Sequence, residues 1–509
     1  MITYNFCIIV SIIVYLLIML TVGFMFSKNN SSSEDFYLGG RKLGPLVTAM
    51  SAEASDMSSW LLMGIPGLAY LSGICDVFWT VIGLGIGTWL NWFFVARRLR
   101  RYSSNLNAIT IPEFYSKRYH DNQNAINAIA ALTIVIFFVP YTASGFAACG
   151  KLFNSLFGVD YMTAMIFSAI IIAGYTIMGG FRAVATTDFI QSCVMTIALA
   201  VVLIYATSKA GGTAAVMDNA KTMAGYLSLN AMHDVESGGA TPYGFITIIS
   251  TMAWGLGYFG MPHILLRFMA IEDEKKLVLS RRVASIWVFI AMFAAICIGV
   301  VGNAVSKAQV METLEGSASE TVIVKIAGLI AENGVFPALV AGVILAGILA
   351  ATMSTADSQM LAAASSVSQN IVQDFFKIKL SEKKNLLVAR ITILVICVIA
   401  VFLAKDPDSS VFGIVSFAWA GFGGAFGAMT LCALFWKRSN KWGALAGVIS
   451  GGVMVFVWKF LVRPLGGAWN IYELLPAFIV SFICIVVVSL ATAKPDDSIE
   501  KEFDAVKEA

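Results

Sequence analysis

The sequence predicts an all-α polytopic membrane protein, and three observations lead to this fold class. The first is composition, because 58% of the 509 residues are hydrophobic and only 13% are charged, whereas soluble domains average about 45–50% apolar and about 25% charged residues. The second is a series of thirteen apolar runs, each close to the roughly 20 residues that cross a bilayer as a helix. The third is the uneven distribution of basic residues between the segments that connect these runs.

The apolar runs predict the order of the membrane spans. The first run has no basic segment before it and is too long for the h-region of a signal peptide, so we expect a membrane helix there. The runs fall at 6–26, 45–70, 74–96, 124–150, 160–180, 187–208, 243–262, 283–304, 335–372, 387–404, 410–436, 442–462 and 473–493.

The basic residues predict the orientation of the chain. If the N-terminus lies outside, the inner segments hold 26 of the 34 Lys and Arg residues, and the outer segments hold 8. Because inner loops of membrane proteins are rich in Lys and Arg, we expect thirteen spans with the N-terminus outside and the C-terminus inside. The outer loops 209–242 and 305–334 are expected to be surface loops or to include a short gating helix.

The second run contains the polar stretch "SAEASDMSSW", residues 51–60. Its two acids, Glu53 and Asp56, would each cost several kcal/mol at membrane depth. Ser and Asp side chains compete for backbone hydrogen bonds, and Gly64 and Pro66 follow directly. The stretch therefore predicts a broken helix at a functional site, while a polar contact between helices is the alternative.

The seventh run contains "WGLGYFGMPH", with three glycines and Pro262 within eight residues. This pattern predicts a second broken helix. Trp254 and Tyr258 are four residues apart and would share one helical face. A break flanked by two aromatic residues favours a small amphipathic ligand, and close helix packing through glycine is the alternative.

The ninth run contains "ILAATMSTADSQMLAAASS". In a helix, the carbonyl of Ala351 lies near the side chains of Ser354 and Thr355, so three neutral oxygens can converge on one point. Oxygen ligands suit hard cations, and the absence of nearby Cys or His favours Na⁺. Back-bonding of Ser and Thr to their own helix is the alternative.

Two broken spans five positions apart are typical of transporters that consist of two inverted five-helix repeats. The repeats would here comprise spans 2–6 and 7–11. The net charge of +3 does not suggest nucleic-acid binding, and the sequence contains no nucleophile–base–acid pattern and no metalloenzyme spacing of its 8 Cys and 3 His. We therefore expect a transporter and not an enzyme.

Six segments of the chain resemble the sodium:solute symporter family, and within it the sodium/proline symporters. The resemblance extends from about Tyr37 to about Val480, with the motifs in the family's order and spacing. It implies a leucine-transporter-type fold with a 5+5 inverted repeat. The segments are "LGGRKLGP", "SAEASDMSSWLLMGIPG", "WGLGYFGMPHILLRFMA", "ATMSTADSQ", "FAWAGFGGAFG" and "KRSNKWGALAGVISGG".

The expected organisation is a single transmembrane transporter domain over residues 1–495. Its parts are an extra N-terminal helix at 6–26, a first repeat at 45–208, a second repeat at 243–436 and two extra C-terminal helices at 442–493. The charged cytoplasmic tail, 496–509, is expected to be mobile.

The resemblance implies one sodium site and suggests a second. In the first, the ligands are the backbone carbonyls of Ala54, Met57 and Ala351 and the hydroxyls of Ser354 and Thr355. Asp56 matches the acid on which sodium binding depends. Asp188 matches an acid that in some members serves a second, inner Na⁺ site, here with Ser354, Asp357 and Ser358.

The resemblance also implies a substrate cavity. Three residues depart from the pattern of the proline symporters, because Glu53 and Ser59 stand where Gly is usual and Met261 stands where Gln is common. These departures leave the identity of the substrate open. We expect Arg267 to be an ion-pair partner at the inner gate. The cavity residues are Ser58, Trp60, Tyr141, Trp254, Tyr258 and Pro262.

The sequence thus predicts a Na⁺-coupled symporter that imports L-proline or a closely related small amino or imino acid by alternating access. Alternatives are a Na⁺ symporter of the same family for another amino acid, a small carboxylate or a sugar acid, and a substrate-gated sensor or channel. The expected partners are a small-molecule substrate and the lipid bilayer, with no obligate protein partner. The expected location is the plasma membrane of a bacterium.

Overall fold

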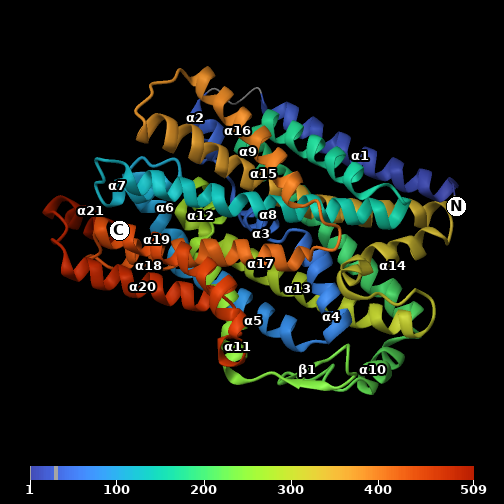
Figure 1. Ribbon diagram of the computed structural model, residues 1–509. Coiled ribbons are helices and arrows are strands. Elements are labelled where there is room, and N and C mark those ends of the chain that lie inside the picture. The colour runs from blue at the N-terminus through green and yellow to red at the C-terminus, as the bar shows by residue number, and fades with distance from the viewer. Residues whose placement is uncertain (1, 28–31, 509) are drawn as a thin grey trace.

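The computed structural model describes residues 2–27 and 32–508, which form a bundle of long helices running side by side (Figure 1). Ten helices in this part of the chain are long and apolar enough to cross a membrane. They are built from α1 (Ile2–Ser27), α5 (Cys75–Leu90) with α6 (Ala96–Asn105), α8 (Ala125–Phe157), α9 (Tyr161–Lys209), α13 (Leu277–Lys307), α15 (Val335–Ser365), α16 (Glu382–Leu403), α17 (Val411–Phe422) with α18 (Ala428–Phe435), α19 (Lys441–Val457) and α20 (Leu474–Ala491).

Three shorter apolar helices fall within the remaining expected spans, at Trp60–Ser72, Tyr161–Gly174 and Phe245–Gly260. The helix α9 runs through the expected spans 160–180 and 187–208 without a loop, but it is kinked at Gly180, where φ is 64° and ψ is −177°. Only glycine adopts such a conformation without strain. The kink therefore separates the two spans that the sequence predicts.

The second span is broken where the sequence predicts. The helix α3 (Pro45–Asp56) ends at the polar stretch, and Met57 has non-helical angles, φ −80° and ψ 75°. A π-helical turn, Trp60–Gly64, then leads into α4 (Ile65–Ser72). Pro66 lies in the first turn of α4, where its missing N–H costs no hydrogen bond.

The seventh span is also broken. The helix α11 (Phe245–Met252) tightens into a 3₁₀ segment, Ala253–Gly260, and Met261 is extended before α12 (Pro262–Ala270) begins. Pro262 again occupies the first position of the new helix. In the ninth span, by contrast, α15 passes through Ser354 as a continuous helix, so its polar residues do not interrupt it.

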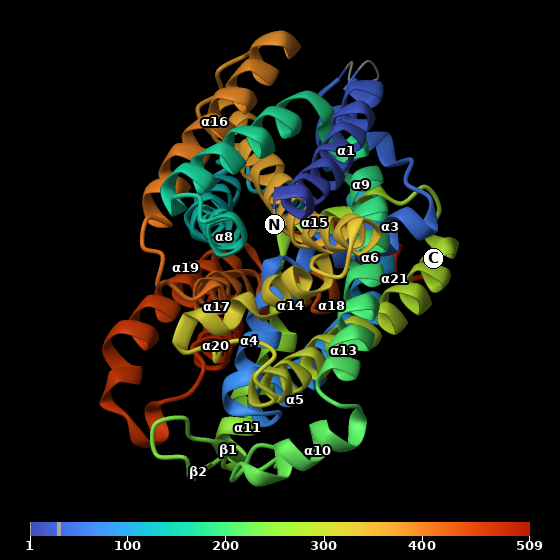
Figure 2. The ribbon, with the colours of Figure 1, turned by 90° about the vertical axis from the view of Figure 1, so that its right-hand side faces the viewer.

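The remaining elements connect these helices. They include a hairpin whose strands pair antiparallel, next to α10, along one edge of the bundle (Figure 2). The helix α14 lies in the segment 305–334, which the sequence predicts to be an outer loop, after a short 3₁₀ segment at Gly316–Thr321. The elements are α2 (Ser33–Leu38), α7 (Ile111–Arg118), α10 (Thr213–Thr222), β1 (Ala231–His233), β2 (Ala240–Pro242), α14 (Val322–Ala331) and α21 (Asp497–Glu508).

The two ends of the bundle differ in the segments they carry. The helices α2, α6, α7 and α21 gather at the left-hand end in Figure 1, whereas α14 and the start of α1 lie at the right-hand end. The start of α1 and α21 therefore lie at opposite ends of the bundle (Figure 1).

The C-terminal tail is a docked helix and not the mobile segment that its charge suggested. In α21, Ile499, Phe503 and Val506 are buried, which places them on one helical face at positions i, i+4 and i+7. The guanidinium of Arg98 lies 4.7 Å from the centre of the Phe503 ring, and Lys437 forms an ion pair with Asp504 at 2.6 Å. A narrow apolar stripe among many charges thus anchors the tail.

Candidate ion- and solute-binding site

The ninth and second spans bring neutral oxygens to one point. The Ser354 hydroxyl oxygen lies 2.7 Å from the carbonyl oxygen of Ala54 on α3 and 3.1 Å from that of Ala351. The Thr355 hydroxyl donates to the Ala351 carbonyl at 3.2 Å. All four residues are buried. The first two distances connect α15 to the end of α3, so the cluster is more than back-bonding within one helix.

Met57 and Asp56 lie at the unwound end of α3, directly beyond this cluster. Both are completely buried. Because the helix stops there, the carbonyl groups around Met57 are not committed to a helical ladder. The carbonyls of Ala54 and Met57 and the two hydroxyls of α15 form a small site of uncharged oxygens, which suits a monovalent hard cation.

Asp56 is the point at which three aromatic side chains meet. Its backbone carbonyl accepts hydrogen bonds from the Trp60 indole at 2.9 Å and from the Tyr141 hydroxyl at 3.2 Å. Its carboxylate accepts one from the Tyr258 hydroxyl at 2.5 Å. The three donors lie on the second, fourth and seventh spans, so Asp56 joins both broken spans to α8.

Trp254 lies at the centre of an aromatic cluster beside these residues. Its ring centre is 6.2 Å from that of Trp60, 6.1 Å from that of Trp419 and 5.1 Å from that of Tyr472. Its backbone carbonyl accepts a hydrogen bond from the Trp419 indole at 2.8 Å. The sequence pattern did not identify Trp419 or Tyr472 as cavity residues, although Trp419 lies in the quoted segment "FAWAGFGGAFG".

The other two expected cavity residues lie at the breaks themselves. The Ser58 hydroxyl accepts from the Trp60 backbone N–H at 3.4 Å, which holds the unwound stretch of the second span. Pro262 begins α12 and is buried. Ser58, Trp60, Tyr141, Trp254, Tyr258 and Pro262 are all buried, so the structure shows this site closed.

A buried ion pair connects α8 to the segment 305–334. The Lys151 ammonium on α8 lies 2.7 Å from the Glu320 carboxylate in that segment. Glu320 also accepts hydrogen bonds from the Ser410 hydroxyl at 2.9 Å and from the Val411 N–H at 3.2 Å, and so caps the start of α17. The 3₁₀ segment of loop 305–334 is thereby fastened to two membrane helices.

A second buried ion-pair network connects α12 to α9, α3 and α15. Arg267 on α12 forms a salt bridge with Asp188 on α9 at 3.0 Å. Its guanidinium also donates to the Ser51 hydroxyl at 3.0 Å and to the Ser358 hydroxyl at 2.6 Å. The structure therefore brings together Asp188 and Ser358, as the resemblance implies, but with the cation of Arg267 between them. The Ser358 hydroxyl also donates to the Asp357 carboxylate, at 3.3 Å.

The three residues that depart from the proline-symporter pattern are all buried: Glu53, Ser59 and Met261. Glu53 accepts a hydrogen bond from the Trp92 indole at 2.9 Å. Trp92 lies in the π-helical turn Asn91–Val95 between α5 and α6. The sequence pattern did not connect these two residues, because 39 positions separate them.

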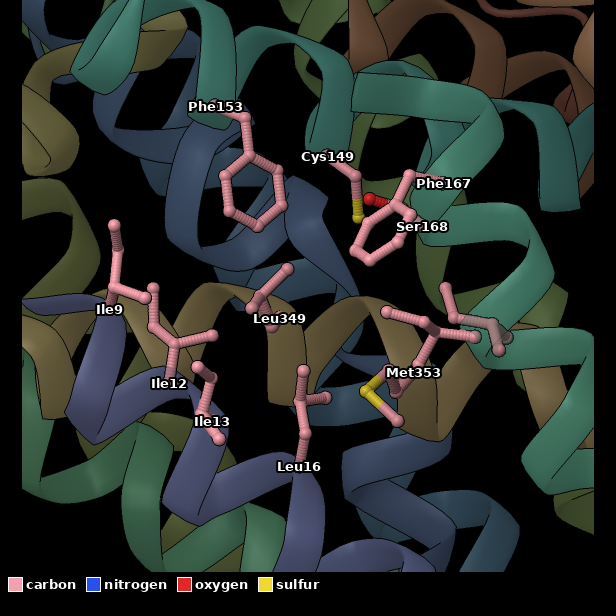
Figure 3. A pocket seen from close by; sticks show the side chains of 12 residues that line it. Ile9, Ile12, Ile13, Leu16, Cys149, Phe153, Phe167, Ser168, Leu349 and Met353 are labelled. Carbon is pink, nitrogen blue, oxygen red and sulfur yellow. The ribbon is translucent and has the colours of Figure 1, made fainter. Parts of the chain in front are cut away.

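An apolar pocket of about 270 Å³ lies elsewhere, between α1, α8, α9 and α15 (Figure 3). Its lining includes Ile9, Phe153 and Leu349 and contains no charged side chain. Ile13 and Phe167 in its lining are 48% and 63% exposed on the surface of the bundle. The pocket therefore faces the lipid and lacks the polar groups that would orient an amino acid.

Within residues 2–27 and 32–508, no group of three or more His, Cys, Asp or Glu side chains is arranged to hold a metal ion. Divalent cations are usually bound by several carboxylates, and transition metals by His or Cys. The oxygen cluster between α3 and α15 consequently fits a monovalent ion better than either class.

Comparisons with known proteins agree with this geometry. The family model described as "Sodium:solute symporter family" matches residues 36–451. The chain is 39% identical to the osmoregulated proline transporter OpuE of Bacillus subtilis, over 96% of this chain and 95% of the relative. It is also 39% identical to the sodium/proline symporter of Escherichia coli, over 97% and 95% of the two chains.

Two solved structures share the fold. A Na⁺-coupled sialic acid symporter in a substrate-bound outward-open state has a TM-score of 0.78 at 18% identity, with 97% of this chain and 99% of that chain covered. MhsT in complex with L-phenylalanine has a TM-score of 0.52 at 12% identity, with 88% and 98% covered. The likeness shows that the helices of this chain follow a known transporter architecture.

Proposed function

The chain belongs to the sodium:solute symporter family, and on this premise we propose that it is a secondary active Na⁺-coupled symporter that imports L-proline or a closely related small amino or imino acid. Its curated relatives are named as proline transporters and sodium/proline symporters. The chain is a multi-pass protein of the plasma membrane, which fits the ten apolar helices. Transport proceeds by alternating access.

One observation carries the proposal: Asp56 connects the ion site to the aromatic cluster. Its neighbours Ala54 and Met57 offer carbonyls to the ion, while Asp56 itself holds Trp60, Tyr141 and Tyr258. An ion bound at those carbonyls fixes the unwound backbone to which the aromatic side chains are attached. Substrate then binds to a site that is already ordered, which is positive coupling between the two ligands.

We assign the transported Na⁺ to five oxygens on α3 and α15. They are the carbonyls of Ala54, Met57 and Ala351 and the hydroxyls of Ser354 and Thr355. The hydrogen-bond distances of 2.7 to 3.2 Å among four of these residues support the assignment. Asp56 adds negative charge next to this neutral site and so strengthens its affinity for a cation.

The substrate is assigned to the aromatic cluster between the broken spans. The apolar ring of proline would pack against Trp254 and Tyr258, beside Trp60. Its charged ends would meet the backbone groups freed at the two breaks and the hydroxyl of Ser58. Tyr141 and Pro262 complete the lining.

We further propose the leucine-transporter-type topology in full, with repeats at 45–208 and 243–436 and thirteen spans in all. The N-terminus lies outside and the C-terminus inside. The opposite positions of α1's start and α21 support ends on opposite sides of the membrane (Figure 1), and the distribution of Lys and Arg assigns the N-terminus to the outside. In this arrangement Lys151–Glu320 closes the outer side, and Arg267–Asp188 closes the inner side.

The resemblance also suggests Asp188, Asp357 and Ser358 as ligands of a second, inner Na⁺. The bonds of Arg267 to Asp188 and Ser358 favour another assignment in the closed state. There the guanidinium acts as a tethered cation that neutralises Asp188. Release of Arg267 when the inner side opens would expose these oxygens to a departing ion.

The driving force suffices for concentrative uptake. One charge that moves through 100 mV contributes about 2.3 kcal/mol, and a tenfold Na⁺ gradient adds about 1.4 kcal/mol. Together these support accumulation of roughly 500-fold for each Na⁺ transported.

The test is uptake of labelled L-proline into proteoliposomes with and without an inward Na⁺ gradient, in competition with a panel of amino acids, small carboxylates and sugar acids. The proposal expects saturable uphill uptake that requires Na⁺ and is blocked best by proline or a close analogue. Better competition by another solute would assign the alternative substrate within the family. Flux that never exceeds equilibrium would indicate a channel or sensor.

A further inference from the structure

A cavity of about 400 Å³ opens on the surface of the bundle, and none of its lining residues belongs to the ion- and solute-binding site. Its walls come from two parts of the chain. One is the turn Asn91–Val95 with the start of α6, and the other is the short 3₁₀ turn Glu274–Lys276 with the start of α13. The charged side chains of the lining are three bases and one acid: Arg97, Lys275, Arg281 and Glu274.

Phe93 brings two of the bases close to one another. The Arg281 guanidinium lies 4.9 Å from the centre of the Phe93 ring. Arg97 follows Phe93 by four residues in a continuous run of helix, so it lies beside that ring on the same face. The two guanidiniums therefore flank one aromatic side chain, and Lys275 completes the basic part of the lining.

The acids at the cavity already have partners. Glu274 accepts hydrogen bonds from two nitrogens of the Arg101 guanidinium, at 2.5 and 2.7 Å, and lies 3.7 Å from Arg97. The Asp273 carboxylate accepts the backbone N–H of Lys275 at 2.9 Å. One acid shared between two arginines leaves the lining with an excess of positive charge.

Two of the three bases have no acidic partner within the described residues. Neither the Arg281 guanidinium nor the Lys275 ammonium forms an ion pair there. An arginine side chain donates through a planar fork that matches the oxygens of a phosphate group. A phosphate in the cavity would therefore supply the negative charge that this part of the chain lacks.

The cavity lies where the outer surface of the bundle changes from apolar to basic. The rings of Trp89 and Phe93 stack with their centres 5.0 Å apart, and both are exposed. Arg97, one turn further along, is the first basic residue after this apolar surface. Val278 in the lining is also exposed. A ligand here would touch apolar side chains at one end and basic side chains at the other.

We propose that this cavity binds the phosphate headgroup of an anionic phospholipid. The phosphate lies between Arg97, Lys275 and Arg281, and an acyl chain runs along Phe93 and Val278. Charge complementarity selects a phosphate, and the exposed apolar residues beside it select a lipid over free inorganic phosphate. The lipid would bridge the starts of α6 and α13.

The test is lipid binding to the purified full-length protein in detergent, measured by native mass spectrometry during titration with phosphatidylglycerol or phosphatidylcholine. Phosphatidylglycerol should bind more tightly than phosphatidylcholine. Arg97→Gln combined with Arg281→Gln should lower the affinity for phosphatidylglycerol by about tenfold or more, because each base near an anionic headgroup contributes to binding. Arg282→Gln removes an exposed arginine of α13 that does not line the cavity, so this matched control should bind as the wild type does.

A single change keeps the test decisive if the double variant is unstable. The Lys275 ammonium forms no ion pair within the described residues, so Lys275→Gln should fold normally and still bind phosphatidylglycerol several-fold more weakly. Equal affinity of the wild type for the two lipids would overturn the proposal. Unchanged affinity for phosphatidylglycerol in Lys275→Gln would also overturn it.

Inorganic phosphate distinguishes a lipid from a free anion as the source of the phosphate group. Millimolar phosphate should leave phosphatidylglycerol bound to the wild type. Displacement of the lipid, together with binding of phosphate to the lipid-free protein, would assign the cavity to a free anion and overturn the lipid proposal.

Discussion

Two polar regions of the bundle both include residues of α3 and α15, but the negative or polar groups in them are arranged in opposite ways. Between α3 and α15, neutral oxygens of Ala54, Ala351, Ser354 and Thr355 converge, and their hydrogen-bond partners within the described residues include no basic side chain. In the second region, Asp188 is bound by the guanidinium of Arg267. The first region is suited to receive a mobile cation, whereas the second contains a cation attached to the chain.

This difference predicts which residues control ion binding and which control closure of the transporter. Changes in the neutral region should alter Na⁺ dependence and leave the fold intact, because no buried charge loses its partner. Changes in the Arg267–Asp188 network should alter stability and the conformational equilibrium, because a buried charge loses its partner. The following predictions test this division.

The largest effect is expected for Arg267→Ala. Removing one partner of a buried ion pair costs about 3–5 kcal/mol, so unfolding in detergent should shift strongly and uptake should fall. Asp188→Asn combined with Arg267→Ala should recover part of the lost stability. The exposed Arg282 at the start of α13 provides the control Arg282→Ala. Equal stability of Arg267→Ala and the wild type would remove the distinction between the two regions.

Asp56→Asn should raise the Na⁺ concentration for half-maximal uptake by about tenfold or more, which corresponds to about 1.4 kcal/mol. The variant keeps an oxygen for the Tyr258 hydroxyl but loses the negative charge beside the ion carbonyls. Its unfolding midpoint should stay near that of the wild type. An unchanged Na⁺ dependence would exclude Asp56 from coupling.

Ser354→Ala and Thr355→Ala should each weaken Na⁺ activation several-fold, and the double variant should lose more than the product of the two factors. Ligands of one ion act together, so their losses are not additive. Thr352→Ala is the control, because the Thr352 hydroxyl donates to the Ile348 carbonyl within the same helix. Effects no larger than those of Thr352→Ala would favour simple back-bonding.

The smallest effect on transport is expected at the C-terminal helix. Phe503→Ala removes the ring that packs against Arg98, so α21 should detach more often, and trypsin should cleave at the exposed Lys501 about tenfold faster. Ser498→Ala, on the exposed side, is the control. Cleavage at the wild-type rate would mean that the charge pairs of Lys437 hold the tail without Phe503.

The sequence predicted the parts of this structure that depend on local pattern. Apolar length predicted the regions of the ten helices that are long enough to cross a membrane, the Gly, Pro and Ser clusters located both breaks, and helical spacing brought together Ala351, Ser354 and Thr355. The contacts of Trp419 and Tyr472 with Trp254 depend on how helices distant in the sequence pack, and a local sequence pattern contains no information about this packing. The same is true of the hydrogen bond between Glu53 and Trp92.

The tail shows a different limitation of sequence patterns. Its many charges predicted mobility, but only three apolar residues at helical spacing were needed to dock α21 onto α6. Conversely, the sequence predicted that Arg267 would form an ion pair at the inner gate. It did not predict that the partner is Asp188, because that depends on the relative positions of α9 and α12. Charge composition alone thus predicts neither docking nor pairing.

The central claim is that Asp56 couples the ion to the substrate, and binding of labelled L-proline to the purified protein tests it most directly. We predict at least tenfold tighter proline binding in saturating Na⁺ than in choline, and by linkage the same factor for Na⁺ when proline is present. In Tyr258→Phe, which removes the hydrogen bond to Asp56, this factor should shrink. Proline affinity that is equal with and without Na⁺ in the wild type would contradict the account.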